Sequence, residues 1–196
     1  MQGWPLLGTL TAGLVLMTLA VLALGSDSEG FRQLIRVTAR SSFALFLLAF
    51  TASAAVRRWP GTVTHWQLAN RRQIGLGFAF SHAIHAAAIA GFAWIDPSAF
   101  HAATSPGNFV SGGLAYVFIV LMAATSFDAA VRWLGAKRWR LLHLTGLYFL
   151  WISFLNTFAK RIPMSAGYVL PVAVLLAALA LRFWPHRRAI QLSTMR

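Results

Sequence analysis

Cysteine is absent from the 196-residue chain. This absence excludes disulfide bonds, iron–sulfur clusters, thiolate ligation of haem and covalent haem attachment through a C-x-x-C-H motif. Any metal or redox group held by this chain must therefore rely on nitrogen, oxygen or thioether ligands.

Acidic residues are almost as scarce, since four Asp and Glu stand against 17 Lys and Arg, giving a net charge of +13. Charged residues make up 11% of the chain, against about 25% in a soluble domain. This deficit excludes an ordinary water-soluble globule, and the 58% hydrophobic content excludes disorder. The basic residues lie in short clusters between long apolar runs, so no nucleic-acid partner is expected. Such charge placement is typical of a membrane protein.

Six apolar stretches are long enough, or nearly so, to cross a bilayer, which takes about 20 helical residues. They predict an all-α membrane protein, a six-transmembrane-helix bundle in the lipid bilayer that forms one domain over residues 1–196. The predicted spans are residues 6–24, 41–56, 74–95, 109–127, 141–159 and 166–181. Residues 29–40 are predicted to form a separate short amphipathic segment on the outer surface.

The loops predict the orientation of these spans. Twelve of the 17 basic residues fall on one side, which the positive-inside rule assigns to the cytoplasm together with both termini. They are Arg57, Arg58, Arg71, Arg72, Arg132, Lys137, Arg138, Arg140, Arg182, Arg187, Arg188 and Arg196.

Nucleotide-binding signatures are missing, because the chain has neither a G-x-G-x-x-G motif nor a P-loop. The tail after Leu181 is also too short to form a flavin or nicotinamide domain. We therefore expect any such domain to be supplied by another chain.

Four polar residues fall inside the predicted spans: His82, His85, His143 and Asn156. An ionisable group in hydrocarbon is expensive and should face the bundle interior with a partner. Few acids are present to pair with them, and no thiolate is available for a structural metal site. Neutral imidazole is the usual axial ligand of b-type haem, so the histidines are candidate haem-iron ligands. Packing is an equally good interpretation for His82, and interhelical hydrogen bonding is the better one for Asn156.

Depth separates these residues into two levels. His85 lies 13 residues after Arg72, or about 20 Å along a helix, and is therefore nearer the outer side. His143 lies about 4.5 Å from Arg140 by the same rise, at the cytoplasmic level where Arg71 is also expected. His85 and His143 are therefore a poor pair for a single haem.

Two motifs resemble a known family. The sequence R-R-Q-I-G-L at residues 71–76, followed by His85, resembles the third helix of ferric-reductase-like transmembrane proteins. The sequence L-G-A-K-R-W-R-L-L-H at residues 134–143, followed by Tyr148, resembles the start of that family's fifth helix. Within the family the likeness is strongest to the haem-binding membrane subunit of the periplasmic methionine-sulfoxide reductase system.

The resemblance implies specific site residues. His85 matches the third-helix haem ligand and His143 the inner histidine of the fifth helix. Asn156 stands where the family has a second fifth-helix histidine, and Arg71 matches an arginine of the sulfoxide-reductase subunit. One or two haem b groups are implied, with FMN or a quinone as a further cofactor.

The resulting hypothesis is a bacterial inner-membrane, multi-pass electron-transfer subunit of an oxidoreductase system, rather than a complete enzyme. The resemblance implies a cytoplasmic flavin reductase or membrane quinol as donor and a periplasmic oxidoreductase subunit as acceptor. The alternatives are a haemless assembly or binding subunit on the same scaffold, and a quinone-binding membrane protein using His82 and His143.

Overall fold

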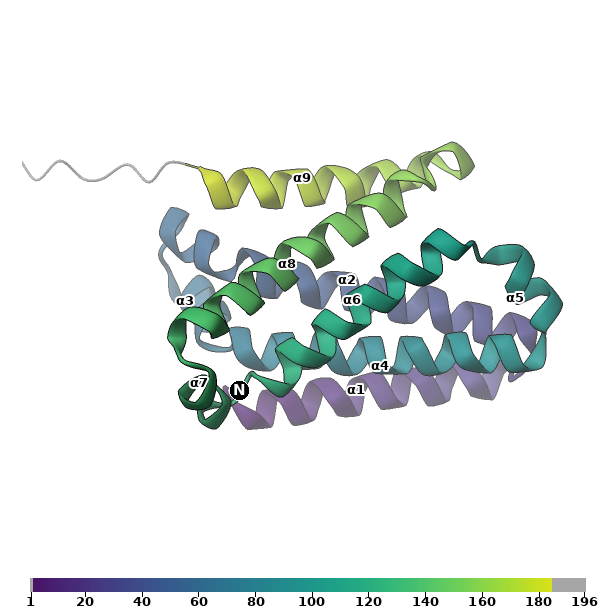
Figure 1. Ribbon diagram of the computed structural model, residues 1–196, viewed down its shortest axis with the longest axis horizontal. Coiled ribbons are helices and arrows are strands. Elements are labelled where there is room, and N and C mark those ends of the chain that lie inside the picture. The colour runs from purple at the N-terminus through teal and green to yellow at the C-terminus, as the bar shows by residue number, and fades with distance from the viewer. Residues whose placement is uncertain (1, 185–196) are drawn as a thin grey trace, which may run out of the picture.

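The computed structural model describes residues 2–184, which fold into helices without any β-strand in that range. Within it, six helices are long and apolar enough to cross a membrane, which confirms the all-α prediction with six candidate spans (Figure 1). The long helices are α1 (Trp4–Leu24), α2 (Ser28–Arg58), α4 (Arg71–Ile95), α6 (Pro106–Ala124), α8 (Ala136–Ala159) and α9 (Val169–Phe183). The basic tail residues Arg187, Arg188 and Arg196 lie outside the described residues.

The connections contain short helices that the sequence analysis did not predict. They are α3 (Thr62–Ala69), α5 (Pro97–Ala103), α7 (Asp128–Leu134) and the 3₁₀ turns Ile162–Met164 and Ala166–Tyr168.

Asp96 begins α5, since its carboxylate accepts a hydrogen bond from the Ala99 N–H at 3.0 Å. This bond, and a second one from the Ser98 hydroxyl, lower the pKa of the Asp96 carboxyl. The ionised carboxylate therefore keeps these hydrogen bonds until the pH falls through its lowered pKa, where protonation weakens the cap.

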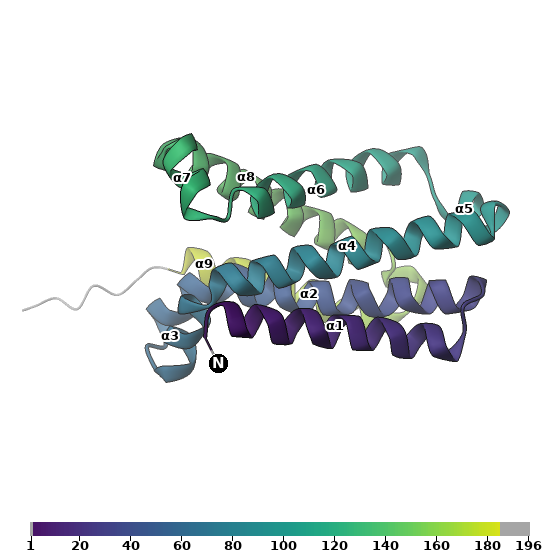
Figure 2. The ribbon, with the colours of Figure 1, turned by 90° about the horizontal axis from the view of Figure 1, so that it is seen from below.

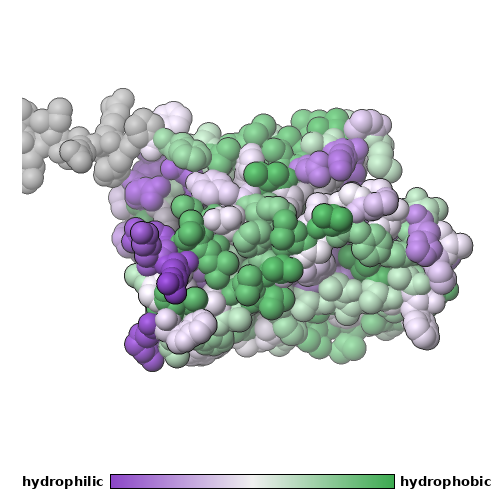
Figure 3. Space-filling view, viewed as in Figure 1, coloured by the Kyte–Doolittle hydropathy of each residue, from purple (hydrophilic) through white to green (hydrophobic). Residues whose placement is uncertain are grey.

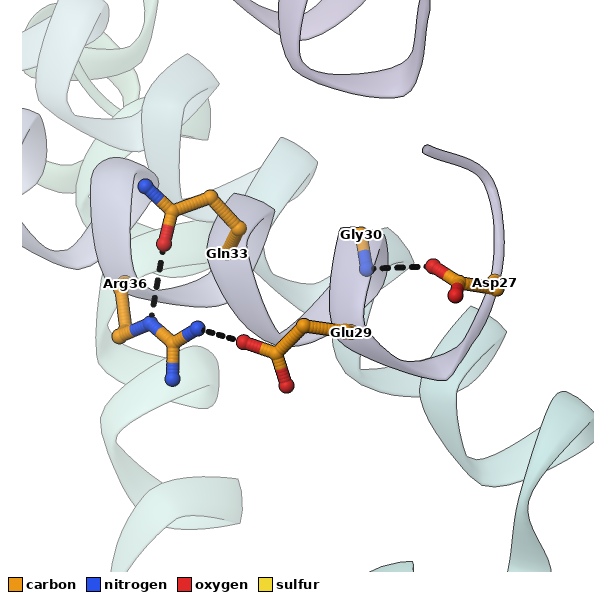
Figure 4. Close-up of polar contacts among 5 residues, drawn as sticks. All are labelled: Asp27, Glu29, Gly30, Gln33 and Arg36. Carbon is orange, nitrogen blue, oxygen red and sulfur yellow. Dashed lines mark hydrogen bonds and ion pairs between the residues drawn. The ribbon is translucent and has the colours of Figure 1, made fainter. Parts of the chain in front are cut away.

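Helix α2 differs from the prediction, because residues 29–40 are not a separate amphipathic segment. They form the first part of one continuous helix of 31 residues. No proline lies between Ser28 and Arg58, so nothing in the backbone interrupts the helix there. Figure 4 shows how it starts: Asp27 accepts the Gly30 N–H at 2.9 Å, Arg36 pairs with Glu29, and Arg36 also donates to Gln33.

The long helices form two layers. Helices α1, α2 and α4 pack together, α6 packs on α8, and α9 closes the bundle against α2 and α8 (Figures 1 and 2). Helices α3 and α7 lie at one end of the bundle with the N-terminus, and the α1–α2 connection and α5 lie at the other.

The α2–α4 interface is held by small polar side chains. Thr38, Ser42 and Ser81 are fully buried there. The Ser42 hydroxyl donates to the Ser81 hydroxyl at 2.8 Å, and the Ser41 hydroxyl bonds to it at 2.9 Å. Small hydroxyl residues let helices approach closely in an apolar medium, where their hydrogen bonds join one helix to the other.

In contrast to this polar interface, much of the surface of the bundle is apolar. Large apolar side chains such as Leu16 and Val120 are more than 60% exposed, whereas hydroxyls and amides are buried between helices. Figure 3 shows apolar side chains over the middle of the bundle and hydrophilic ones at its ends. An apolar band of this extent is incompatible with water and matches a bilayer interior.

Candidate functional site: two histidine levels within the bundle

His85 is held on α4 by a threonine of α2. Its Nδ1 lies 2.9 Å from the Thr38 Oγ1. The Thr38 hydroxyl is also 2.6 Å from the Leu34 carbonyl oxygen, to which it donates. The hydroxyl therefore accepts from His85 Nδ1–H, so the imidazole carries its proton on Nδ1 and its lone pair on Nε2. This is the tautomer in which metal-binding histidines are commonly fixed by a second hydrogen bond.

His82 lies one turn earlier on α4 and is surrounded by rings. Its centroid is 5.5 Å from that of His85, 5.7 Å from Tyr116 on α6 and 5.9 Å from Phe154 on α8. The His82 Nδ1 and the Tyr116 hydroxyl are both buried and have no hydrogen-bond partner among the described residues. Two neighbouring unsatisfied polar groups of this kind are costly in an apolar interior.

His143 lies on α8 at the other level. Its ring stacks on Trp139 with centroids 4.2 Å apart, and its Nε2 is 3.0 Å from the Thr125 Oγ1. Trp139 Nε1–H in turn donates to the Thr125 carbonyl oxygen at 2.8 Å. Thr125, the residue just after α6, thus orients the rings of both His143 and Trp139.

A cavity of about 240 Å³ lies beside His143, between α2, α4, α6 and α8. Most of its wall is apolar, and Arg71 and Arg72 line its α4 side. The other lining residues are Phe46, Ala49, Gly75, Phe78, Ala79, Ile119, Met122, Ala123, Ser126, Val131, Trp139, Leu147 and Leu150. Residues of both α4 and α8 line the cavity, and these two helices make little direct contact, so the cavity lies where they face each other.

The two arginines at this level are held differently. Arg72 pairs with Asp128, which ties the start of α4 to α7. Arg71 donates from Nη1 to the Ser53 Oγ on α2 at 3.2 Å. Arg71 thus keeps its charge inside the bundle with a hydroxyl as its partner.

The structure places the predicted site residues at two levels, as the sequence predicted. Within the described residues, no hydrogen bond or ring contact joins His85 to His143. Asn156 is exposed, whereas the buried face of α8 consists of Leu147, Leu150, Trp151 and Phe158. Its side chain therefore points away from that face, and the expected interhelical hydrogen bond is not formed.

Residues 2–184 contain no group of three or more His, Cys, Asp or Glu side chains that could bind a metal ion directly. A haem iron takes at most two axial ligands from the protein, so it does not require such a group.

Comparison with known proteins gives one informative match. Over 152 residues the chain is 30% identical to a protein-methionine-sulfoxide reductase haem-binding subunit, MsrQ, of Polaromonas naphthalenivorans (strain CJ2), covering 74% of this chain. Over that region the chain is similar to this MsrQ. The match spans 65% of the length of that MsrQ. No family model matches the chain, and no solved structure matches it.

Several residues of the candidate site were not predicted from the sequence. Thr38 was assigned to a surface segment, although its place three residues before Ser41 and four before Ser42 puts it on their helix face. Tyr116 could have been suspected as a hydroxyl inside a predicted span. Thr125 and Trp139 lie at the ends of helices, where only the fold brings them to His143. Arg182 was counted only as a topology signal.

Proposed function

We propose that this protein is a b-type haem-binding membrane subunit that passes electrons across the bilayer. The relative's name assigns haem binding to MsrQ. The single observation that carries the proposal for this chain is the cavity, an apolar intramembrane space with an imidazole on one wall and guanidinium groups on another.

The chemistry of the cavity suits a haem. Its apolar lining matches the macrocycle, His143 offers a neutral nitrogen ligand, and Arg71 suits a carboxylate of the group. At about 240 Å³ it is somewhat smaller than typical ligand pockets of roughly 300–1,000 Å³. Binding therefore requires side chains to move, and ligation through Nε2 would replace the His143–Thr125 hydrogen bond.

His85, at the other level, is a second candidate ligand of haem iron. With Nδ1–H engaged by Thr38, the Nε2 lone pair of His85 is left for iron. Asn156 is exposed on α8, so we do not assign it a ligand role. We accordingly propose that His143 and His85 would hold haem iron at the two levels, with one or two haem b groups per chain.

When bound, haem supplies an iron that takes up and releases one electron at a time. The chain's part is to hold the His85 imidazole in one tautomer, to exclude water with its apolar helices and to balance charge with arginine. We propose that both termini face the cytoplasm of a bacterial inner membrane, because the basic clusters gather at the end that holds α3 and α7. A cytoplasmic flavin reductase or membrane quinol would then donate electrons, and a periplasmic oxidoreductase subunit would accept them. We also propose that the chain forms one ferric-reductase-like transmembrane domain.

A specific observation favours a second candidate function, quinone binding. The rings of His82 and Tyr116 are neighbours, and the His82 Nδ1 and the Tyr116 hydroxyl are both buried without a partner among the described residues, so each could bond to a polar atom of a quinone.

Optical spectroscopy tests the main proposal. Protein purified in detergent from haem-replete cells is expected to show a b-type spectrum, dithionite-reduced minus oxidised, with one or two haems per chain. Colourless protein would overturn the proposal and favour the haemless scaffold or the quinone site.

Histidine variants test the assignment. His85→Ala and His143→Ala are each expected to remove or strongly reduce bound haem. His65→Ala is the matched control, because His65 is exposed on α3 and bonds only to the Gly61 carbonyl. Equal haem content in all three variants would contradict the ligand assignment while leaving the fold intact.

A further inference from the structure

The four acidic side chains all lie within the described residues, and none of them forms an ion pair with Arg71 or Arg182. Asp27 and Glu29 lie at the start of α2, and Asp96 at the far end of α4, about 37 Å from Arg71 by helical rise. Asp128 is the partner of Arg72. With four Asp and Glu in the whole sequence, no side-chain carboxylate remains for Arg71 and Arg182.

Both guanidinium groups are nevertheless held inside the bundle. Arg182, at the end of α9, donates from Nη1 to the Phe50 carbonyl oxygen at 2.7 Å. Its Cζ lies 4.6 Å from the Phe50 ring centroid and 5.5 Å from that of Tyr148 on α8. Arg71 donates to the Ser53 hydroxyl. Both arginines are thus desolvated in part by aromatic and helical neighbours without an anionic partner.

The two arginines reach the same turn of α2. Their acceptors, Phe50 and Ser53, are three residues apart and therefore neighbours on one helix face. The two guanidinium groups therefore bring like charges to the same part of the bundle, where they repel each other. Two like charges placed together in this way are stabilised by an anion between them.

The start of α4 adds a second attraction for an anion. Arg71 is the first residue of this 25-residue helix, whose first turn contains no acidic residue. The Asn70 side chain makes no cap hydrogen bond to it. The N-terminal N–H groups of a helix carry partial positive charge and favour anions.

We propose that Arg71 and Arg182 form an anion clamp that binds a carboxylate of the haem beside His143. This inference rests on the proposed function. Arg71 lines the cavity, and Arg182 of α9 bonds to the turn of α2 that Arg71 also reaches, so the clamp would join α4 and α9 through the ligand. Guanidinium groups bind carboxylate and phosphate alike, so the phosphate of a membrane lipid is the other source of this chemistry.

Reconstitution with two probes tests the clamp. Apoprotein from haem-deficient cells is titrated with haem b and with protohaem dimethyl ester, in which both carboxylates are neutral. The unmodified chain is expected to bind haem b roughly tenfold or more tightly than the ester, as charge-assisted hydrogen bonds require. Arg71→Gln and Arg182→Gln are expected to bring this ratio to about one.

Redox potential gives a second readout. Because a nearby positive charge disfavours the oxidised, more positive iron, either Gln variant is expected to lower the haem midpoint potential. Arg58→Gln is the matched control, since Arg58 lies at the same end of α2 over the Trp59 ring. Arg71→Lys and Arg182→Lys keep the charge and are expected to retain the potential better than the Gln variants.

The outcomes separate the two proposals. Equal binding of haem b and ester by the unmodified chain overturns the clamp but leaves haem binding in place. Loss of co-purified anionic phospholipid in the Gln variants, with an unchanged haem-to-ester ratio, assigns the arginines to lipid and likewise overturns it. Failure of the unmodified chain to bind either probe overturns the proposed function and the clamp together.

Discussion

At the scale of single residues, Thr38 decides which nitrogen of His85 is free. Its hydroxyl donates to Leu34 and accepts from His85 Nδ1. The two bonds together leave the Nε2 lone pair available, so the hydroxyl orients a candidate ligand without touching the iron itself.

We predict that Thr38→Val disturbs His85 while leaving the helix intact. Removing the hydroxyl leaves a buried N–H unpaired at a cost of about 1–3 kcal/mol, and frees the ring to rotate or change tautomer. The expected result is weaker haem retention, a shifted midpoint potential and altered low-spin EPR g-values, with rescue by Thr38→Ser. Thr18→Val is the control, because the Thr18 hydroxyl makes the same bond to a carbonyl four residues earlier. An unchanged EPR spectrum in Thr38→Val would show that this bond does not orient the ligand.

The candidate site was partly predictable from such residues. His82, His85 and His143 could be found because imidazoles are conspicuous inside apolar runs. The partners Thr38, Thr125 and Arg182 could not, since hydroxyls are common in membrane helices and the arginine lies at a helix end, where basic residues are ordinary. Which of many such groups meets a histidine depends on helix rotation, which composition does not determine.

At the scale of elements, the α1–α2 turn brings the backbones of two glycines into close contact. A Cβ built on Gly30 would lie 1.8 Å from the Gly25 carbonyl oxygen and 2.5 Å from the Gly25 carbonyl carbon. Backbone atoms cannot give way as a flexible side chain can, so only glycine fits at this position.

Gly30→Ala is therefore expected to destabilise the α1–α2 hairpin by about 1–3 kcal/mol, the usual cost of overpacking. A lower apparent melting temperature in detergent, followed by tryptophan fluorescence, would report it. Gly8→Ala on α1 is the matched control, because its Cβ would meet nothing within 4 Å. Equal melting of both variants would argue against the tight turn.

The sequence predicted the membrane-spanning helices better than it predicted the full length of α2 or the short helices. All six spans could be predicted, because runs of apolar residues long enough to cross a bilayer have few other structures. The full extent of α2 was missed, since Arg32, Arg36 and Arg40 suggested an interfacial segment. In the structure they lie on exposed positions of a helix whose other face is buried against its neighbours. The short helices α3, α5 and α7 were missed because they are seven or eight residues long.

At the scale of the whole molecule, the ends of the bundle differ in charge and in the elements that form them. Lys137 is exposed at the start of α8, near α7, whereas His101 is exposed on α5 at the opposite end. The absence of cysteine makes single-cysteine labelling of these positions straightforward.

We predict that a membrane-impermeant maleimide added to intact spheroplasts labels His101→Cys, but labels Lys137→Cys only after permeabilisation. The reason is the excess of basic residues around Lys137, which the positive-inside rule keeps in the cytoplasm. The reverse pattern of labelling would show that the orientation proposed above is inverted.

The serine contacts between α2 and α4 have a consequence for assembly. Ser41, Ser42 and Ser81 fasten these helices near their middle, whereas α8 faces α4 across a cavity. The α2–α4 pair is thus joined by side-chain hydrogen bonds. At the basic end, Arg72 of α4 pairs with Asp128 of α7, the short helix that precedes α8. Widening of the cavity, which the proposed haem requires, would therefore separate α8 from α4 rather than α2 from α4.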